Sequence, residues 1–202
     1  MATGIPEHKV VLCGEYGVGK TSIFRRYVDN CFLDVESQPT LGLDNFGKTF
    51  VENGQEFKVT LWDTAGIERF VTMSQAYYRG AAAAILCYSL DNRDSFNILS
   101  QHILDIVVHT QTARIFLCGN KLDLAKGDEI TASDIESFQL QCDTVLSGVY
   151  EISCKTGEGV QEMFRDIARN LFENTSPYES SALQLPKTID ESETKKRAVV
   201  HE

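Results

Sequence analysis

A glycine-rich stretch near the start of the chain has the residue types of a phosphate-binding loop. The stretch GEYGVGKT, residues 14–21, matches the pattern G-x-x-x-x-G-K-[ST] and lies between an apolar run and a segment of helical periodicity. Its glycines would let backbone N–H groups turn towards phosphate oxygens, and the following helix would point its positive end at them. We expect Lys20 to reach the β- and γ-phosphates and Thr21 to bind Mg²⁺. The loop alone does not distinguish ATP from GTP, or a kinase from a switch.

A second polar stretch has the residues needed to recognise a purine base. GNKLD, residues 119–123, follows an apolar run, so it lies at the carboxyl edge of a predicted strand, where open α/β sheets bind ligands. Guanine presents a ring N–H and an amine side by side, and the Asp123 carboxylate could accept from both. Asn120 could connect the base to the phosphate loop, and the Lys121 stem could cover the ring. Further along, SCKTG at 153–157 could donate a backbone N–H to guanine O6.

These stretches need a scaffold, and apolar runs alternate with helical patterns along the chain. Runs that are apolar almost throughout predict strands buried on both faces at 9–13, 57–62, 82–90, 113–120 and 148–153. Apolar spacings of three and four predict helices at 21–30, 93–110, 133–142 and 160–174, the third with a capping box of Ser133 and Glu136. This alternation is typical of an α/β fold with a mostly parallel sheet and helices on both faces.

One segment departs from the parallel pattern. FGKTFVENGQEFKVTLW, residues 46–62, has an Asn53-Gly54 turn between two extended stretches. This pattern predicts a β-hairpin, and with it an antiparallel edge strand. The sheet is therefore predicted to have six strands, of which one is antiparallel.

The chain has the length and composition of one domain followed by a short appendage. It has 202 residues, of which 43% are hydrophobic, enough for an ordinary core. We predict a single domain over residues 1–174. From about Thr175 the pattern dissolves into Ser, Thr, Glu and Lys with two prolines, which predicts a disordered tail at 175–202.

Charge and cysteine usage exclude several classes of protein. The net charge of −10 disfavours nucleic acid and anionic membrane as generic partners, because such surfaces need an excess of Lys and Arg. No apolar run has the length of a signal peptide or membrane span, and the cysteines, which lack a CxxC pair, suit reduced thiols in the cytosol. They are Cys13, Cys31, Cys87, Cys118, Cys142 and Cys154. The histidines show no metal-ligand spacing, and we expect His102 and His109 to have surface or interior roles.

The termini lack the common signals for lipid attachment. Ala2 stands where N-myristoylation needs glycine, and no cysteine follows Cys154 to accept a prenyl group. We therefore expect no direct anchor of these kinds, and any membrane residence to come through partners.

In combination, these motifs resemble the small GTPases of the Ras superfamily. GEYGVGKT, PTLG, WDTAG, GNKLD and ISCKTG occur in that family's order, and the resemblance covers about residues 8–173. Within the superfamily, RFVTMSQAYYRGA and KVTLW resemble the Rab family. The resemblance implies the six-stranded G-domain fold and a monomeric, cytoplasmic, Mg²⁺-dependent switch in membrane trafficking or related signalling. Exchange factor, activating protein and effectors would meet it at 36–48 and 64–80, and partners could hold it at endomembranes.

The resemblance also assigns roles to individual residues. Phe32 would stack beside guanine, Thr40 would close on Mg²⁺ and the γ-phosphate, and Gly66 would sense that phosphate through its N–H. Loss of the γ-phosphate would release both loops. The implied metal ligands are Thr21, Thr40 and Asp63. The implied nucleotide contacts are Tyr16, Gly17, Val18, Gly19, Lys20, Thr21, Ser22, Phe32, Thr40, Gly66, Asn120, Lys121, Asp123, Ser153, Cys154 and Lys155.

Two residues depart from the family at the γ-phosphate. Ile67 occupies the position of a glutamine that orients the hydrolytic water, and isoleucine has no donor or acceptor for this. Tyr16 stands where Gly or Ser is usual, and its ring could obstruct an activating arginine or contact the phosphate. We expect slow intrinsic hydrolysis with charge stabilisation by Lys20. Three alternatives remain: an activating protein supplies the missing group, the protein is a constitutively GTP-bound module, or it is a P-loop kinase or ATPase.

A third departure concerns effector binding. Rab proteins usually have an exposed triad of aromatic residues. Trp62 and Tyr77 resemble two members of this triad, but Asn45 stands at the position of the first member. Phe46 is adjacent, but strand side chains alternate between faces, so we expect it on the opposite side of the hairpin.

Overall fold

The computed structural model of the protein describes residues 5–33, 43–64, 74–110, 112–127 and 129–174. Three residues singled out in the sequence, Thr40, Gly66 and Ile67, lie outside the described residues, and so does the predicted tail at 175–202.

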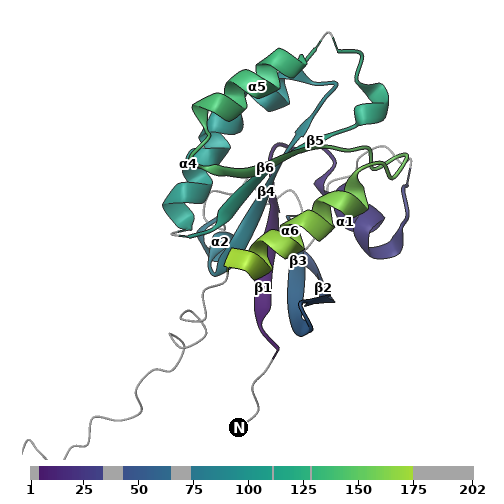
Figure 1. Cartoon of the computed structure of the whole chain (residues 1–202). Helices are drawn as coiled ribbons and strands as arrows, with labels where there is room; N and C mark the ends of the chain where they lie inside the picture. The colour runs from purple at the N-terminus through teal and green to yellow at the C-terminus, as the bar shows by residue number, and fades with distance from the viewer. Residues whose placement is uncertain (1–4, 34–42, 65–73, 111, 128, 175–202) are drawn as a thin grey trace, which may run out of the picture.

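A six-stranded mixed sheet forms the centre of the molecule, in the order β2-β3-β1-β4-β5-β6 (Figure 1). All of its neighbouring strands run parallel except β2 and β3. The prediction of a mostly parallel sheet with one antiparallel edge strand is confirmed. The strands are β1 (Glu7–Cys13), β2 (Leu43–Glu52), β3 (Gln55–Thr64), β4 (Ala81–Ser89), β5 (Arg114–Asn120) and β6 (Leu146–Glu151).

The predicted hairpin joins β2 to β3. Asn53 and Gly54 have φ of 51° and 76°, the two positive values that a tight hairpin turn requires. The turn sets the register, in which Asn45 pairs with Trp62 and Phe46 with Leu61. A local two-residue signal therefore determines which side chains share a face of this edge.

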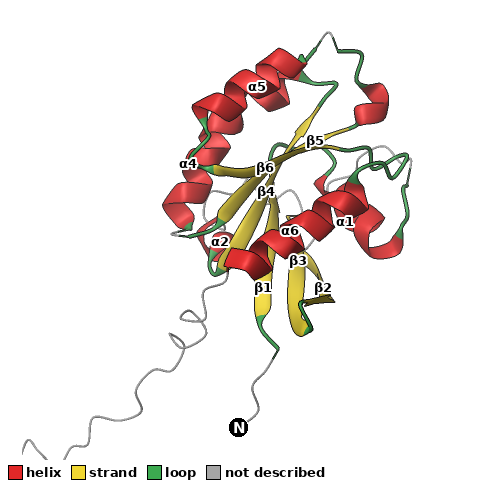
Figure 2. Cartoon of the chain, in the orientation of Figure 1, coloured by secondary structure: helices red, strands yellow, loops and turns green. Residues whose placement is uncertain are grey.

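Helices cover both faces of the sheet, as predicted (Figure 2). Side chains of α1 and α6 pack on one face, and those of α3, α4 and α5 on the other. The residues of β4 alternate between the two cores, which explains why this strand is apolar almost throughout. The helices are α1 (Lys20–Asp29), α2 (Ser74–Tyr78), α3 (Arg93–Asn97), α4 (Leu99–His109), α5 (Ala132–Gln141) and α6 (Val160–Asn174).

Two details of the helix prediction are wrong. The helix predicted at 93–110 is divided into α3 and α4 at Ile98, whose φ of −91° and ψ of −1° depart from the ideal α-helical values. The capping box of α5 consists of Thr131 and Asp134 rather than Ser133 and Glu136. Thr131 has the extended backbone of an N-cap, so its hydroxyl reaches the Asp134 N–H and the helix begins at Ala132. None of the helices in the described ranges combines the length and apolar character that a membrane span needs.

The Asp134 carboxylate also ties α5 to α3. Arg93 donates to its two oxygens at 2.6 and 2.9 Å, and the Thr131 N–H donates to it at 2.9 Å. The hydrogen bonds from Arg93, followed by those from Thr131, hold the pKa of Asp134 well below its ordinary value. A bidentate pair of this kind constrains the relative position of the two helices.

We predict that Asp134→Asn lowers stability at neutral pH and that acid removes the difference. The folded-state pKa lies below the unfolded value of about 4, so the carboxylate stabilises the fold above pH 4. This contribution is lost as the pH falls towards the folded-state pKa. Urea unfolding at pH 7 and at pH 3 should show a smaller gap between wild type and variant at pH 3. Glu136→Gln, an exposed position on the same helix, serves as control, and an equal gap at both pH values would contradict the assignment.

Candidate functional site

The phosphate-loop residues form a tight turn between β1 and α1. Gly14, Gly17 and Gly19 have φ of 123°, 82° and 96°, values that side-chain-bearing residues rarely adopt. A Cβ on Gly14 would lie 2.1 Å from the Cys87 carbonyl oxygen, and one on Gly19 would lie 2.4 Å from Asn120 Nδ2. The glycines therefore allow the loop to pack directly on β4 and on the end of β5.

Lys20 folds back over this loop. Its Nζ donates to the carbonyl oxygens of Gly14 at 2.7 Å and Glu15 at 2.8 Å, and the residue is only 6% exposed. It also begins α1, whose N-cap Gly19 has no side chain to satisfy the first N–H groups of the helix. A buried ammonium beside a helix N-terminus can bind a phosphate group.

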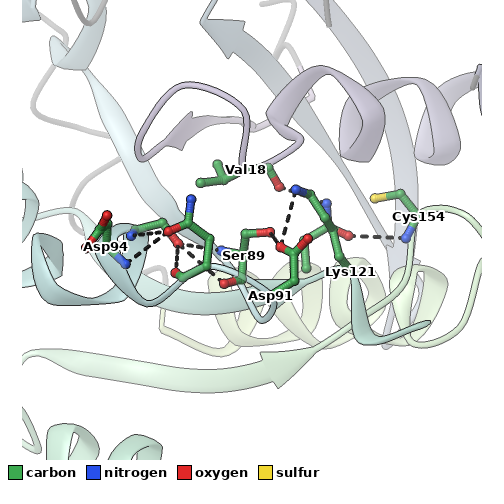
Figure 3. Close-up of polar contacts among 9 residues, drawn as sticks. Val18, Ser89, Asp91, Asp94, Lys121 and Cys154 are labelled. Carbon is green, nitrogen blue, oxygen red and sulfur yellow. Dashed lines mark hydrogen bonds and ion pairs between the residues drawn. The ribbon is translucent and has the colours of Figure 1, made fainter. Parts of the chain in front are cut away.

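The Asn120 side chain connects three segments that are distant in sequence. From the end of β5, its Nδ2 donates to the Val18 carbonyl at 2.9 Å, and its Oδ1 accepts from the Cys154 N–H at 3.2 Å (Figure 3). Asn120 is 2% exposed, so both of these hydrogen bonds are shielded from water. They hold the phosphate loop and the segment 153–157 against the end of the sheet.

The remaining residues of the predicted base site lie next to this bridge. The Ser153 hydroxyl donates to Asp123 at 2.5 Å and accepts from the Thr156 N–H at 3.1 Å. Lys121 has a left-handed backbone, with φ of 66°, and its Nζ lies 3.4 Å from Asp91 Oδ1. Ser153 thus holds the Asp123 carboxylate and Asp91 holds the Lys121 side chain just beyond the end of β5, an arrangement that suits recognition of a flat base with donor groups.

Asp91 and Ser89, which the sequence interpretation missed, support Lys121. The Ser89 hydroxyl donates to the Asp91 carboxylate that faces Lys121 (Figure 3). Burial raises the pKa of Asp91, but the hydrogen bond from Ser89 and the charge of Lys121 outweigh it, and the pKa is lowered. The carboxylate therefore stays charged beside the lysine at neutral pH.

The other predicted residues that the structure describes are distributed around the loop. Thr21 and Ser22 lie in the first turn of α1, and Asp63 is 1% exposed near the end of β3. Phe32 packs on the core that α1 and α6 form, while Tyr16 is 39% exposed. Thr21 and Asp63 can each offer an oxygen to Mg²⁺, an ion that takes few ligands from protein and the rest from phosphate and water. Among the described residues, no group of three His, Cys, Asp or Glu residues could hold a metal ion alone.

The thiols near the loop are unsuited to nucleophilic chemistry. Burial, followed by the proximity of Cys87, raises the pKa of Cys154 to about 12. Burial also raises the pKa of Cys87 well above its ordinary value, with a further increase from Cys118. All six cysteines are free, and a neutral thiol is a poor nucleophile. Cys31 and Cys142, by contrast, are only half-buried.

His102 contacts the phosphate loop from α4. Its Nε2 lies 3.0 Å from Glu15 Oε1, and its side chain is 13% exposed. The prediction of a surface or interior role for His102 therefore missed a contact with the candidate site. The two residues are 87 positions apart, and no local pattern in the sequence could have paired them.

A second surface lies on the opposite side of the β2–β3 hairpin from the α1 core. Asn45 is exposed and pairs with Trp62, whose carbonyl accepts from the Tyr77 hydroxyl at 2.8 Å. Tyr77 is only 7% exposed, so the expectation that it belongs to an exposed triad is wrong. Lys9 Nζ lies 4.8 Å from the Trp62 ring centroid and 5.5 Å from that of Tyr77. Phe46 packs on the other face, as predicted, with its ring 6.5 Å from that of Tyr27.

The comparisons with known proteins agree with this geometry. A model of the Ras family matches residues 9–173. The chain belongs to the Ras family. Rab-30 of Homo sapiens is 37% identical to this Ras-family chain over 164 residues, which cover 81% of the chain and 79% of Rab-30. Rab-4A of Rattus norvegicus is 34% identical over 164 residues, which cover 81% of this chain and 73% of Rab-4A. Rab-31 of Rattus norvegicus is 34% identical over 168 residues, which cover 83% of this chain and 84% of Rab-31. The Ras-superfamily and Rab resemblance of the motifs is thus confirmed.

Two glycine substitutions in this Ras-family loop should differ in cost. Gly17→Ala places a side chain at positive φ with nothing within 4 Å, and should cost about 1 to 2 kcal/mol of unfolding free energy. Gly14→Ala adds a collision with the Cys87 carbonyl, so we expect it to cost at least about 1 kcal/mol more. Urea denaturation of both variants in the same buffer measures the difference. Equal losses would show that the loop moves freely away from β4.

Proposed function

We propose that this Ras-family protein is a Rab-like, Mg²⁺-dependent guanine-nucleotide switch with weak intrinsic GTP hydrolysis. The observation that carries the proposal is the Asn120 bridge, which joins the phosphate loop to the segment 153–157. A P-loop kinase or ATPase would need the loop but not its connection to the segment 153–157, in which Ser153 contacts the Asp123 carboxylate. Asp123 lies three residues beyond the bridge and is oriented by Ser153.

Each group of residues has a part in the proposed binding mode. Gly17, Val18, Gly19, Lys20, Thr21 and Ser22 would surround the phosphates through N–H groups and the lysine ammonium. Phe32, Asn120, Lys121, Asp123, Ser153, Cys154 and Lys155 would enclose the guanine. Thr21, Thr40 and Asp63 would hold Mg²⁺, whose charge would offset that of the phosphate oxygens. Thr40 and Gly66 would close on the γ-phosphate and open when it leaves.

The hydrolytic step is where we expect the protein to be weak. Water would attack the γ-phosphate in line, with Lys20 and loop N–H groups stabilising the charge that develops. Ile67 cannot orient that water, because its side chain forms no hydrogen bonds. The exposed Tyr16 lies on the loop where an activating residue from a partner would have to approach. These residues also favour the second candidate, a constitutively GTP-bound module.

The cellular role is proposed from the family. We infer a cytoplasmic, monomeric protein that acts in membrane trafficking or related signalling and reaches endomembranes through partners. Exchange factor, activating protein and effectors would bind at 36–48 and 64–80. Because the exposed Asn45 replaces an aromatic residue opposite Trp62, its effectors should contact a polar position there.

Asp123→Asn should change the base that the protein accepts. The amide would donate where the carboxylate accepts, so GDP affinity should fall about 100-fold while xanthosine diphosphate gains affinity. Competition against a fluorescent GDP analogue measures both constants, with the exposed Asp143→Asn as control. ATP that competes as well as GDP for the wild-type protein would reject a guanine-nucleotide switch in favour of a kinase or ATPase.

Ile67→Gln should restore a group that can orient water. We expect single-turnover phosphate release from GTP-loaded protein to rise at least about tenfold, a barrier change of roughly 1.4 kcal/mol. Ile67→Leu, which preserves the apolar character, should leave the rate unchanged. Wild-type release as fast as that of Ile67→Gln would contradict weak hydrolysis. No wild-type release within hours, even with Rab-directed activators, would support the constitutive module.

A further inference from the structure

Arg26 of α1 contacts two separate parts of the proposed base site. Its Nε donates to the Cys154 carbonyl at 2.7 Å, and its Nη2 donates to the Lys155 carbonyl at 2.9 Å. Its Nη1 donates to the backbone carbonyl of Asn30 at 2.9 Å and to the side-chain oxygen of Asn30 at 3.2 Å. A single guanidinium therefore connects the segment 153–157 to the end of α1.

The contacts with two successive carbonyls determine how the peptide groups of the segment face. In a planar trans peptide, the C=O of one residue and the N–H of the next point in opposite directions. Because the Cys154 carbonyl points at Arg26, the Lys155 N–H points away from it, towards the other side of the segment. The next peptide follows the same rule, and there the Thr156 N–H donates to the Ser153 hydroxyl that also binds Asp123.

The contact with Asn30 lies next to Phe32, the residue that we propose to stack beside guanine. Asn30 caps the C-terminus of α1 with a left-handed backbone, φ 50°, and the chain then leads to Phe32. Arg26 holds both the backbone and side-chain oxygens of this turn. Because α1 begins at the phosphate loop, Arg26 also connects the segment 153–157 and the turn at Asn30 to the helix that starts at the phosphates.

We propose that Arg26 is a positioning residue for base recognition: it orients the backbone of 153–157 so that an N–H group of this segment contacts O6 of guanine. The proposal rests on the guanine-nucleotide function proposed above. The planar guanidinium has donors that diverge in fixed directions, whereas a lysine ammonium is a point charge that cannot hold two carbonyls and the turn at Asn30 together. The effect of Arg26 should therefore be specific to O6 and separate from that of Asp123, which would contact the ring N–H and amine.

Two nucleotide analogues distinguish these contacts. In 6-thio-GDP a sulfur atom, which is a weak acceptor, replaces O6, whereas IDP keeps O6 and lacks the amine. For Arg26→Ala we expect the affinity ratio of GDP to 6-thio-GDP to fall at least about threefold, since about one hydrogen bond is weakened. The ratio of GDP to IDP should stay unchanged. Competition against a fluorescent GDP analogue gives all the constants for the full chain.

The controls separate positioning from general stability. Arg25→Ala removes an exposed arginine from the same helix and should leave both ratios as in the wild type. Arg26→Lys keeps the charge but not the diverging donors of the guanidinium, so it should lower the affinity ratio of GDP to 6-thio-GDP as Arg26→Ala does. It serves as the test if Arg26→Ala fails to fold. Weakening of all three nucleotides by one factor would overturn the proposal and leave Arg26 a structural role. Failure of wild-type protein to bind GDP would instead reject the proposed function.

Discussion

The two hydrogen bonds of the buried Asn120 amide are the constraint on which the candidate site depends. An amide buried at the end of β5 must satisfy its donor and acceptor within the protein, because an unpaired buried polar group costs about 1 to 3 kcal/mol. Val18 and Cys154 supply the partners, so the phosphate loop and the segment 153–157 cannot shift independently without leaving a buried polar group unpaired. The glycine at position 19 is part of the same constraint, since a Cβ there would collide with the amide.

The order of the strands explains why these segments meet at all. From β1 the chain builds β2 and β3 on one side and β4, β5 and β6 on the other, so the loop after β1 lies where the direction of winding reverses. Because these strands other than β2 are parallel, the residues that follow β1, β4, β5 and β6 emerge at one edge. Lys20, Asp91, Asn120 and Ser153 reach the site for this reason, although more than 130 residues separate the first from the last.

Features with a local physical cause could be predicted from the sequence, and features with a tertiary cause could not. The Asn53-Gly54 pair predicts a hairpin turn at those two residues, and the apolar runs predict strands buried on both faces. The capping box of α5 lies two residues before its predicted position, because Thr131 and Ser133 are chemically alike and only the backbone decides which residue is the N-cap. The contacts of Glu15 with His102 and of Arg26 with 153–157 join elements that the fold alone brings together. Their residues look like ordinary charged surface in the sequence.

Under the proposed function, nucleotide binding and hydrolysis depend on different kinds of group. Binding uses carbonyls, amides and charged side chains that hold one another in place, as Ser153 and Asp123 do, or Ser89, Asp91 and Lys121. Groups that hydrogen-bond to one another in this way keep their positions when a residue that makes none of these hydrogen bonds is replaced. Orienting a water molecule requires a donor or acceptor at one position next to the γ-phosphate, and Ile67 has neither. A substitution there can therefore weaken hydrolysis while the groups that bind the base and phosphates keep all their partners, which is how one fold could serve as a timed switch or a persistent GTP-bound state.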